Sequence, residues 1–526
     1  MKLKPALATL FIGIALYFGL PLLAPVPSAQ SFKGTVAPAK TAAVTPKAET
    51  PTPAATAQQP AAAAAAPSAA EIAAKAALEA KRRADWLRGL HLLAIFITTI
   101  IGIILKPLPM GAVAIVGIAL TAVSGTLPIA DALSGFSDVV IWLIVLAFFI
   151  SRGFIKTGLG SRIAYNFMVL LGKRTLGLSY GLAATDLVLA PAIPSNTARA
   201  GGIVMPIMVS LAQAYGSKAG DGTERKIGSF LTLTAYQVNC ITSAMFLTAM
   251  AANPLAQKLA GDLKINITWA GWALAAIVPG LLSLLIVPWV IYKLYPPEVK
   301  ETPNAVQMAR QKLAELGRVS VKEYMMLGVF ALLLVLWIFA KQFGDMNATT
   351  AALIGLSALI ILGVLGWEDV KTETGAWDTL VWFAALVMMA SFLNKLGIVP
   401  WFSQSIGSMM GGHGWIFAFL MLSLIYFYSH YFFASNTAHV ASMYAAFLGV
   451  AVTLGAPPML AALLLGFFSN LFAGITHYGA GPAPVLFGTG YVNVGTWWRI
   501  GFIVSVINIV IWIGIGGLWW KAIGLW

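Results

Sequence analysis

The 526-residue chain has little charge: Asp, Glu, Lys and Arg make up 10% of it, whereas hydrophobic residues make up 59%. An ordinary globular protein carries roughly a quarter charged residues. Twelve of the 52 charged residues fall between residues 25 and 89, which leaves 40 for the other 461. So few charges cannot cover a surface in water, and the composition therefore predicts an all-α polytopic membrane protein.

Other absences narrow the function. Cys240 is the only cysteine, which excludes a disulfide framework. Gly172-Lys173 lacks the upstream glycine of a phosphate-binding loop, so the chain has no motif for ATP-driven transport. No HExxH or CxxC pattern surrounds the five histidines, which argues against a metal site. The excess of Lys and Arg lies in short loops between apolar runs, as in membrane proteins and unlike nucleic-acid binders. We predict no enzyme activity and no metal.

The chain divides into five consecutive parts. Residues 1–24 have a basic start and an apolar run, typical of a first transmembrane helix or of a cleaved signal peptide. Residues 25–89 form an Ala/Pro-rich tether that ends in a short helix. We assign 90–295 to a first repeat, 296–320 to an amphipathic cytoplasmic helix, and 321–526 to a second, inverted repeat.

From His91 onward, apolar runs recur at the spacing of membrane-spanning helices of about 20 residues. We predict spans at 91–106, 110–127, 139–156, 228–256, 271–294, 322–341, 349–366, 377–396, 459–490 and 498–521. Two further apolar stretches, 176–214 and 415–454, are interrupted by PAIPSNTARAGG and FFASNTAHVAS. Non-helical backbone at membrane depth is tolerated only where it lines a cavity or is buried in protein. We therefore predict two re-entrant hairpins with Ser-Asn-Thr at their tips.

Lysine and arginine are unevenly distributed between the two sets of loops that these spans create. With the N-terminus inside, the cytoplasmic segments contain 20 of them, the other side contains 5, and the tether contains 8. Positive residues are retained in cytoplasmic loops. The distribution therefore predicts a cytoplasmic N-terminus and a cytoplasmic 296–320 segment.

An internal repeat is the strongest pattern in the sequence. Ser-Asn-Thr-Ala occurs at 195–198 and again 240 residues later at 435–438. An Asp-x-x-x-Trp pattern precedes each copy by the same distance, and a Thr-x-x-x-Ala-x-Pro pattern follows each; they begin at Asp138, Asp378, Thr248 and Thr476. Five spans separate equivalent points, and an odd number inverts the second copy. We predict an inverted repeat of five spans each, the architecture of secondary transporters.

Each Ser-Asn-Thr motif places two hydroxyls and an amide at the start of a helix, where free N–H groups and the helix dipole favour anions. An alternative is that the motif only caps the helix that follows it. Two such tips facing each other would bind a small dicarboxylate, with one carboxylate at each tip. The predicted substrate-binding residues are therefore Ser195, Asn196, Thr197, Ser435, Asn436 and Thr437.

A cationic residue follows each motif, Arg199 in the first half and His439 in the second. In a membrane interior such residues are functional candidates, and we predict that both compensate the charge of the substrate. Fixed cations in place of Na⁺ would make the empty carrier costly to reorient, which favours exchange. The alternatives are an Arg199 that reaches the membrane surface, a neutral core His439, and neutralisation by Asp186, itself also a candidate proton carrier.

Several stretches resemble the divalent anion/Na⁺ symporter superfamily, especially its branch of bacterial di- and tricarboxylate permeases and plastid 2-oxoglutarate/malate translocators. The similarity covers residues 90–526, and residues 3–27 are similar to the first helix of the family, which favours a retained span. The stretches are KPLPMGAVAIVG (106–117), GFIKTGLGSRIAY (153–165), LAPAIPSNTARAGG (189–202), FLTAMAANPLA (246–256), FYSHYFFASNTAHV (427–440), THYGAGPAPV (476–485) and GGLWWKAIGLW (516–526).

The resemblance implies about eleven transmembrane helices plus two re-entrant hairpins, a homodimer, and elevator-type movement of a transport domain against a scaffold. It places Asn253, Pro254, Gly481 and Pro482 in unwound segments beside the substrate. Sodium-coupled members usually carry a Gly-Thr-Pro-Pro-type run in these segments, whereas this chain has AMAANP and GAGPAP. This departure argues against Na⁺ coupling.

Motifs and resemblance together predict a di- or tricarboxylate antiporter of the bacterial inner membrane, exchanging malate, succinate, 2-oxoglutarate, tartrate or citrate. Such a protein needs no cofactor, and Na⁺ enters only in the alternative of Na⁺- or H⁺-coupled symport through the same site. An anion channel is a further alternative. The expected partners are the carboxylate substrate, the lipid bilayer and a second copy of the chain, and no nucleic acid.

Overall fold

The computed structural model describes residues 3–23, 69–409 and 414–526, and within these ranges it contains helices and no β-strand. The predicted tether therefore lies outside the described residues except for its last part, 69–89. Nine helical stretches among the described residues are long and apolar enough to cross a bilayer. The predicted all-α membrane protein is confirmed; the number of spans in each repeat stays a prediction.

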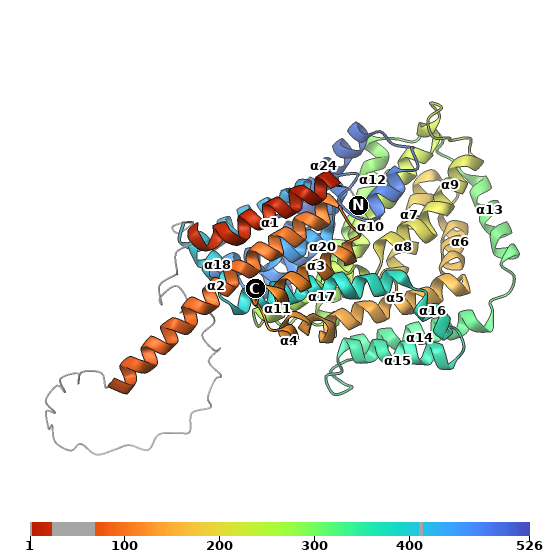
Figure 1. The fold of residues 1–526 in the computed structure, drawn as a ribbon. Helices are drawn as coiled ribbons and strands as arrows, with labels where there is room; N and C mark the ends of the chain where they lie inside the picture. Colours follow the sequence, from red (N-terminus) through yellow and green to blue (C-terminus); the bar gives the residue numbers. More distant parts are fainter. Residues whose placement is uncertain (1–2, 24–68, 410–413) are drawn as a thin grey trace, which may run out of the picture.

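The N-terminal helix α1 (Leu3–Leu23) lies alongside α2 (Ala69–Leu105), as Figure 1 shows. The helix α2 passes through the boundary that we placed at residues 89 and 90, so the short helix and the first span are one element. The reason is visible in the sequence, which contains no proline between Ala69 and Leu105 and is rich in Ala and Leu.

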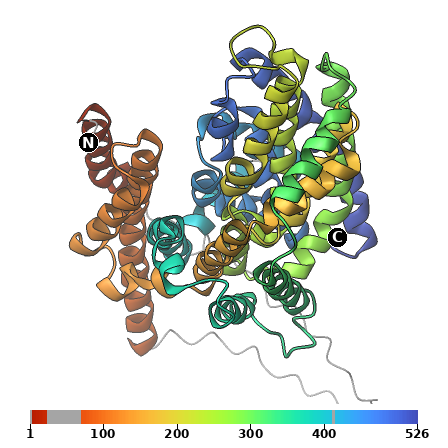
Figure 2. The same cartoon turned by 90° about the vertical axis from the view of Figure 1, so that its right-hand side faces the viewer.

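The described helices fall into two groups, each of which packs mainly within itself. The first group surrounds α17 and contains the pair α14 and α15, which lie side by side below α5 in Figure 1. Figure 2 shows that α1, α2 and α3 form one edge of the molecule. Besides α2, this group consists of α3 (Met110–Val123), α5 (Val139–Thr157), α14 (Val321–Ile338), α15 (Ala348–Ile361), the short α16 (Trp367–Lys371) and α17 (Thr374–Lys395), with α4 (Ile129–Ala132) and η2 (Ser134–Ser137) between α3 and α5.

The second group contains the two hairpins. In each, two helical arms meet at Ser-Asn-Thr, and the arm after the tip contains a five-residue π-helical segment, η3 or η7, at positions 240 residues apart. Such segments are rare and concentrate at functional sites. The first hairpin is α7 (Thr175–Leu189), α8 (Asn196–Arg199), η3 (Ala200–Val204) and α9 (Met205–Ala214); the second is α19 (Trp415–Tyr428), η6 (Ser429–Phe432), α20 (Asn436–His439), η7 (Val440–Tyr444) and α21 (Ala445–Thr453).

Two broken helices complete the setting of the tips. The first runs from α10 (Gly228–Met245) through η5 (Leu247–Ala249) to α11 (Ala252–Asp262). The second runs from α22 (Pro458–Leu471) through η8 (Phe472–Ile475) to α23 (Pro482–Phe487), so the predicted span 459–490 is interrupted. The segment η3 packs on α23 and η7 packs on α11, so each hairpin reaches the broken helix of the opposite half.

The remaining helices enclose this group. The helices α6 and α18 were not predicted, because both are short and carry polar residues. Arg162 of α6, for example, forms an ion pair with Glu323 of α14 at 2.5 Å. The surface helix α13 lies within the predicted 296–320 segment and packs against α6. These elements are α6 (Leu159–Leu171), α12 (Trp269–Leu294), α13 (Pro303–Glu315), α18 (Ile398–Met409), α24 (Val494–Val510), η9 (Ile511–Ile515) and α25 (Gly516–Ala522), with the short η4 (Glu224–Lys226).

Gly501 of α24 sets how closely that helix approaches the break in the second broken helix. A Cβ at this position would lie 2.4 Å from the backbone oxygen of Gly474. We expect Gly501→Ala to lower stability by about 1–3 kcal/mol, the usual cost of overpacking, measured as a lower melting temperature in detergent. Gly514→Ala is the control, since nothing lies within 4 Å of a Cβ there. Equal melting temperatures for the two variants would contradict this role.

Candidate functional site

The two hairpin tips reach the same point, on either side of Met250. Asn196 Nδ2 donates to Met250 Sδ at 3.5 Å, and Asn436 Nδ2 donates to the same sulfur at 3.1 Å. Met250 follows η5, in the unwound segment between α10 and α11. Two motifs that are 240 residues apart in the sequence are thus joined through one side chain, the arrangement that the repeat led us to expect.

Within each Ser-Asn-Thr motif, the serine makes a capping hydrogen bond and the other two side chains do not. Ser195 Oγ accepts a hydrogen bond from the Ala198 backbone N–H at 3.1 Å, and Ser435 Oγ accepts one from Ala438 at 3.3 Å. The serines therefore cap the helices, as in the capping alternative. The Asn and Thr side chains are not used for capping. Asn436 is buried, and its Oδ1 has no hydrogen-bond partner among the described residues.

Gly481 brings the second broken helix against the first tip. A Cβ at Gly481 would lie 2.1 Å from Thr197 Oγ1, so any side chain there would force the Thr197 hydroxyl to move. Pro482 is buried and begins α23 directly after this contact. Gly481 lies beside the first tip, whereas Pro482 begins α23 and Asn253 and Pro254 lie in the first turn of α11, not in the unwound segments that the resemblance implied. The contact of these residues with a substrate stays a prediction.

Asn253 hydrogen-bonds to the backbone at the interruption between α10 and α11. Its Nδ2 donates to the backbone oxygens of Ser243 at 2.8 Å and Phe246 at 2.9 Å, and its Oδ1 accepts from Asn470 Nδ2 at 2.7 Å. Both amide hydrogens are therefore committed to carbonyls that the interrupted helix leaves without partners. Pro254, which follows, is buried. Asn253 thus holds the break open, and the substrate contact predicted for Asn253 and Pro254 stays untested.

Arg199 is completely buried among acceptors. Its Nε lies 3.0 Å from Asp186 Oδ1, and its side chain is 0% exposed. Its Nη1 donates to the backbone oxygens of Ile193 and Ala249, both at 2.6 Å, and its Nη2 donates to Ser243 Oγ at 2.9 Å. Arg199 therefore does not reach the membrane surface. The observed arrangement is the alternative in which Asp186 neutralises it.

The polar residues of α10 hold the other side of Asp186. Thr242 Oγ1 donates to one carboxylate oxygen, and Asn239 Nδ2 lies 3.2 and 3.3 Å from the two oxygens. Asn239 Nδ2 also lies 3.4 Å from the backbone oxygen of Asn196, which connects this cluster to the first tip. All eighteen residues of α10 are buried, so its polar side chains need partners inside the protein.

His439 lies in a chain of hydrogen bonds that runs from Ser429 to Gly479. His430 Nε2 is 2.8 Å from the backbone oxygen of Gly479, His430 Nδ1 is 2.9 Å from His439 Nδ1, and His439 Nε2 is 3.2 Å from Ser429 Oγ. A carbonyl only accepts, so we assign the His430 proton to Nε2. His439 Nδ1 then donates to His430 Nδ1, and this contact is made with both rings uncharged. The single Ser429 hydroxyl proton has the Tyr426 backbone oxygen at 2.9 Å and His439 Nε2 at 3.2 Å within reach, and because a carbonyl only accepts, we assign this proton to Tyr426.

The two halves thus differ at matched positions. The residue 240 positions after Asp186 is Tyr426, whose ring lies 4.7 Å from that of His439 and whose hydroxyl is 2.8 Å from Ser469 Oγ. An ion pair in the first half corresponds to an uncharged ring contact in the second. Arg199 and His439 therefore lie in different environments, one beside a carboxylate and the other beside a tyrosine ring. Their predicted role in compensating the charge of a substrate stays a prediction.

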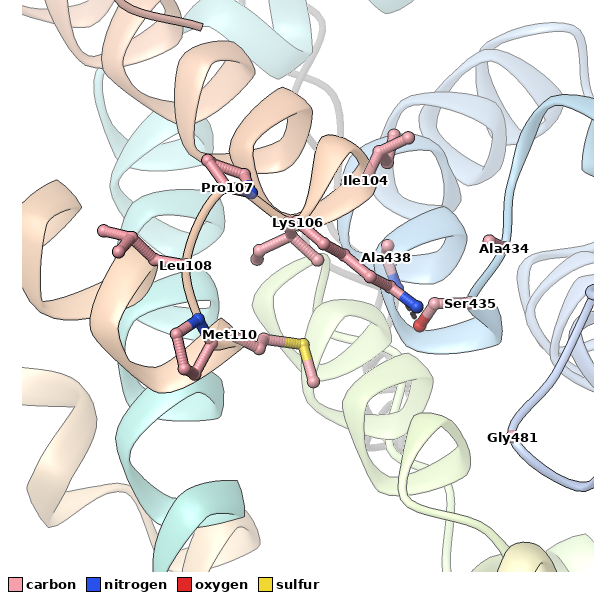
Figure 3. A pocket seen from close by; sticks show the side chains of 11 residues that line it. Ile104, Lys106, Pro107, Leu108, Met110, Ala434, Ser435, Ala438 and Gly481 are labelled. Carbon is pink, nitrogen blue, oxygen red and sulfur yellow. Dashed lines mark hydrogen bonds between the residues drawn. The ribbon is translucent and has the colours of Figure 1, made fainter. Parts of the chain in front are cut away.

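A cavity of about 520 Å³ opens beside the second tip (Figure 3). One wall is the connection between α2 and α3, and the other includes Ser435, Ala438 and Gly481. Among the described residues, no group of three or more His, Cys, Asp or Glu side chains is placed to hold a metal ion. The cavity wall at the second tip contains the Ser435 hydroxyl and the start of α20.

Comparison with known proteins identifies the family. The profile of the sodium:sulfate symporter transmembrane region matches residues 86–526. The chain belongs to this family, part of the divalent anion/Na⁺ symporter superfamily. Because the family and the relatives given below are transporters, the chain is a multi-pass membrane transporter and not an enzyme.

Several curated relatives resemble the chain over most of their length. It is 61% identical to the putative malate transporter YflS of Bacillus subtilis, covering 83% of this chain and 91% of that one. It is 53% identical to dicarboxylate transporter 1, chloroplastic, of Arabidopsis thaliana (83% and 79%) and 41% identical to the inner membrane protein YbhI of Escherichia coli (83% and 92%). The YdaH transporter of Alcanivorax borkumensis shares the fold, with a TM-score of 0.52 at 14% identity, over 77% of this chain and 88% of that one.

Asp186 and Arg199 form the buried ion pair that holds the first tip. Asp186→Asn leaves the guanidinium without its counter-charge, and we expect a loss of about 3–5 kcal/mol in stability, measured as a lower melting temperature in detergent. The double variant Asp186→Asn/Arg199→Gln should recover much of this loss, because no unpaired charge is left.

The exposed pair Arg174–Glu301 provides the matched control, since its side chains are 75% and 67% exposed. Glu301→Gln should change stability by no more than about 1 kcal/mol. If Asp186→Asn melted at the same temperature as Glu301→Gln, the buried pair would have no structural role.

Proposed function

We propose that this transporter exchanges dicarboxylates across the membrane and needs no Na⁺. The substrate would lie between the two tips, where the Asn196 and Asn436 amides already converge on Met250. The names of the relatives, a putative malate transporter and a chloroplastic dicarboxylate transporter, support this substrate class. Malate, succinate, 2-oxoglutarate, tartrate and citrate are the candidates.

One observation supports the proposal that transport does not require Na⁺. A Na⁺ ion beside a hairpin tip would be coordinated by the carbonyl oxygens that the broken backbone leaves free. Arg199 already donates to two of these, those of Ile193 and Ala249, and His430 donates to that of Gly479 in the other half. A Na⁺ bound to the same oxygens in the first half would be repelled by the guanidinium. Fixed N–H groups thus take the place that a coupling cation would occupy.

An unpaired buried cation, which would favour exchange, is not present at Arg199, because Asp186 pairs with it. The amides and hydroxyls at the tips give another reason. In an empty carrier passing through a closed state the tip amides have only the Met250 sulfur, a weak acceptor, and a poorly satisfied buried donor costs up to about 1–3 kcal/mol. A bound dicarboxylate supplies acceptors at both tips and lowers this barrier.

Movement by an elevator mechanism is supported by the two helix groups, since the hairpins and broken helices pack mainly with one another and separately from the group around α17. The family resemblance supports a homodimer. The name of the relative YbhI, an inner membrane protein, supports the same location for this chain in a bacterium.

Proton-coupled symport is the second candidate, because the chain from Ser429 through His439 and His430 to Gly479 is a continuous set of hydrogen bonds. A proton added at His439 Nε2 would donate to Ser429 Oγ and leave the other hydrogen bonds in place, but it would put an unpaired charge among buried rings, which is costly. Exchange needs no such buried charge, which is why we favour it.

Uptake into proteoliposomes tests the mode of transport. Labelled malate should enter only vesicles that contain an unlabelled dicarboxylate, at the same rate with Na⁺ or K⁺ outside, since fixed donors replace the coupling ion. Vesicles without internal dicarboxylate are the control. Uptake into these empty vesicles driven by a Na⁺ gradient would overturn the proposal, and uptake driven by a pH gradient would establish the proton-coupled alternative.

The tip amides provide a second test. We expect Asn196→Ala and Asn436→Ala each to reduce exchange by at least about a hundredfold, since each removes donors to a carboxylate, with unchanged amounts of protein in the membrane. Asn166→Ala is the control, because Asn166 is exposed and bonds only to its own helix at Arg162. Near-normal rates in both tip variants would remove these residues from the site.

A further inference from the structure

Lys106 lies in the wall of the cavity that faces the second tip. It directly follows α2, in the connection to α3, and its side chain extends across the cavity toward Ser435 and Ala438 (Figure 3). No Asp or Glu in the part of the chain that the structure describes forms an ion pair with it. The residues around it in the same wall, such as Pro107 and Leu108, are apolar.

The backbone at Lys106 is unusual. Its φ is +50°, in the left-handed region that residues with a side chain rarely adopt, and its N–H donates to the Gly102 oxygen at 3.0 Å. Glycine is the common residue at such a position after a helix. Pro107 adds a further restriction on the residue before it. A lysine held where glycine would fit better indicates that the side chain is needed, since strained residues cluster at functional sites.

The other cationic groups near the tips are already engaged. Arg199 is paired with Asp186, and the two histidines of the second half are buried and bond to one another through their Nδ1 atoms. A dianion between the tips needs positive charge nearby, because its desolvation is costly. Among the described residues that line this cavity, Lys106 is the only cation.

We propose that Lys106 is a substrate-binding residue whose ammonium group pairs with the carboxylate held at the second Ser-Asn-Thr tip. This inference rests on the proposed function and adds a residue to the same site. Lys106 belongs to the helix group around α17, whereas Ser435 belongs to the hairpin group. The pairing therefore forms when the two groups lie as they do here, with the cavity between them.

Malate exchange in proteoliposomes tests the proposal through KM. Lys106→Gln should raise KM for malate at least about tenfold, the loss expected for a charge-assisted contact, and Lys106→Arg should restore most of the affinity. Lys106→Gly should raise KM as much as Gln does, while its melting temperature stays equal or rises, because glycine adopts a positive φ freely.

Lys264 is the matched control: it is an exposed lysine with a φ of +64° that does not line the cavity. Lys264→Gln and Lys264→Gly should keep the wild-type KM. An unchanged KM in Lys106→Gln would overturn the inference. A higher KM in Lys106→Gly accompanied by a lower melting temperature would also overturn it, because the lysine would then be structural.

Thiol labelling gives a readout independent of transport. Cys240, the only native cysteine, is buried, so Lys106→Cys provides a single accessible thiol. Saturating malate should slow its reaction with a methanethiosulfonate that adds an ethylammonium group, and the completed reaction should restore a low KM. Labelling at the same rate with and without malate would contradict the proposal. A wild-type protein that exchanges no dicarboxylate would instead contradict the proposed function itself.

Discussion

The helices are interrupted in four places within apolar surroundings, and each interruption leaves backbone carbonyl and N–H groups that need partners other than those of a regular helix. The remaining features of the site follow from how these groups are satisfied. Asn253 bonds to the carbonyls of Ser243 and Phe246, Arg199 to those of Ile193 and Ala249, and His430 to that of Gly479. Side chains that finish the hydrogen bonding of interrupted helices therefore also form the walls around the two tips.

The two halves share a backbone plan and differ in chemistry. Their π-helical segments lie 240 residues apart, and each hairpin packs on the broken helix of the other half. One half buries an ion pair, and the other buries uncharged rings at the corresponding positions. A repeat of this kind fixes where polar groups gather, whereas single substitutions decide whether they carry charge.

Much of this plan could be predicted from the sequence. The identical Ser-Asn-Thr-Ala motifs located both tips, because polar residues are costly within long apolar runs and are kept there mainly where they serve a site. Short helices such as α6 were missed, since Arg162 and Asn166 interrupt the apolar pattern. Met250 and His430 gave no signal, because a methionine or a histidine in an apolar run looks like core. Asp186 was named, but only coordinates could establish its pairing with Arg199.

Among the described residues, the Met250 side chain accepts a hydrogen bond from both tip asparagines. Sulfur is a weak acceptor, so the two amide groups are held in place without being strongly bound. In the exchange proposed above, a carboxylate that took over these donors would give up little in displacing the thioether, and the thioether would return as readily when the carboxylate left. A weak acceptor between the tips would thus keep the two amides aligned in the empty protein without making substrate binding or release slow.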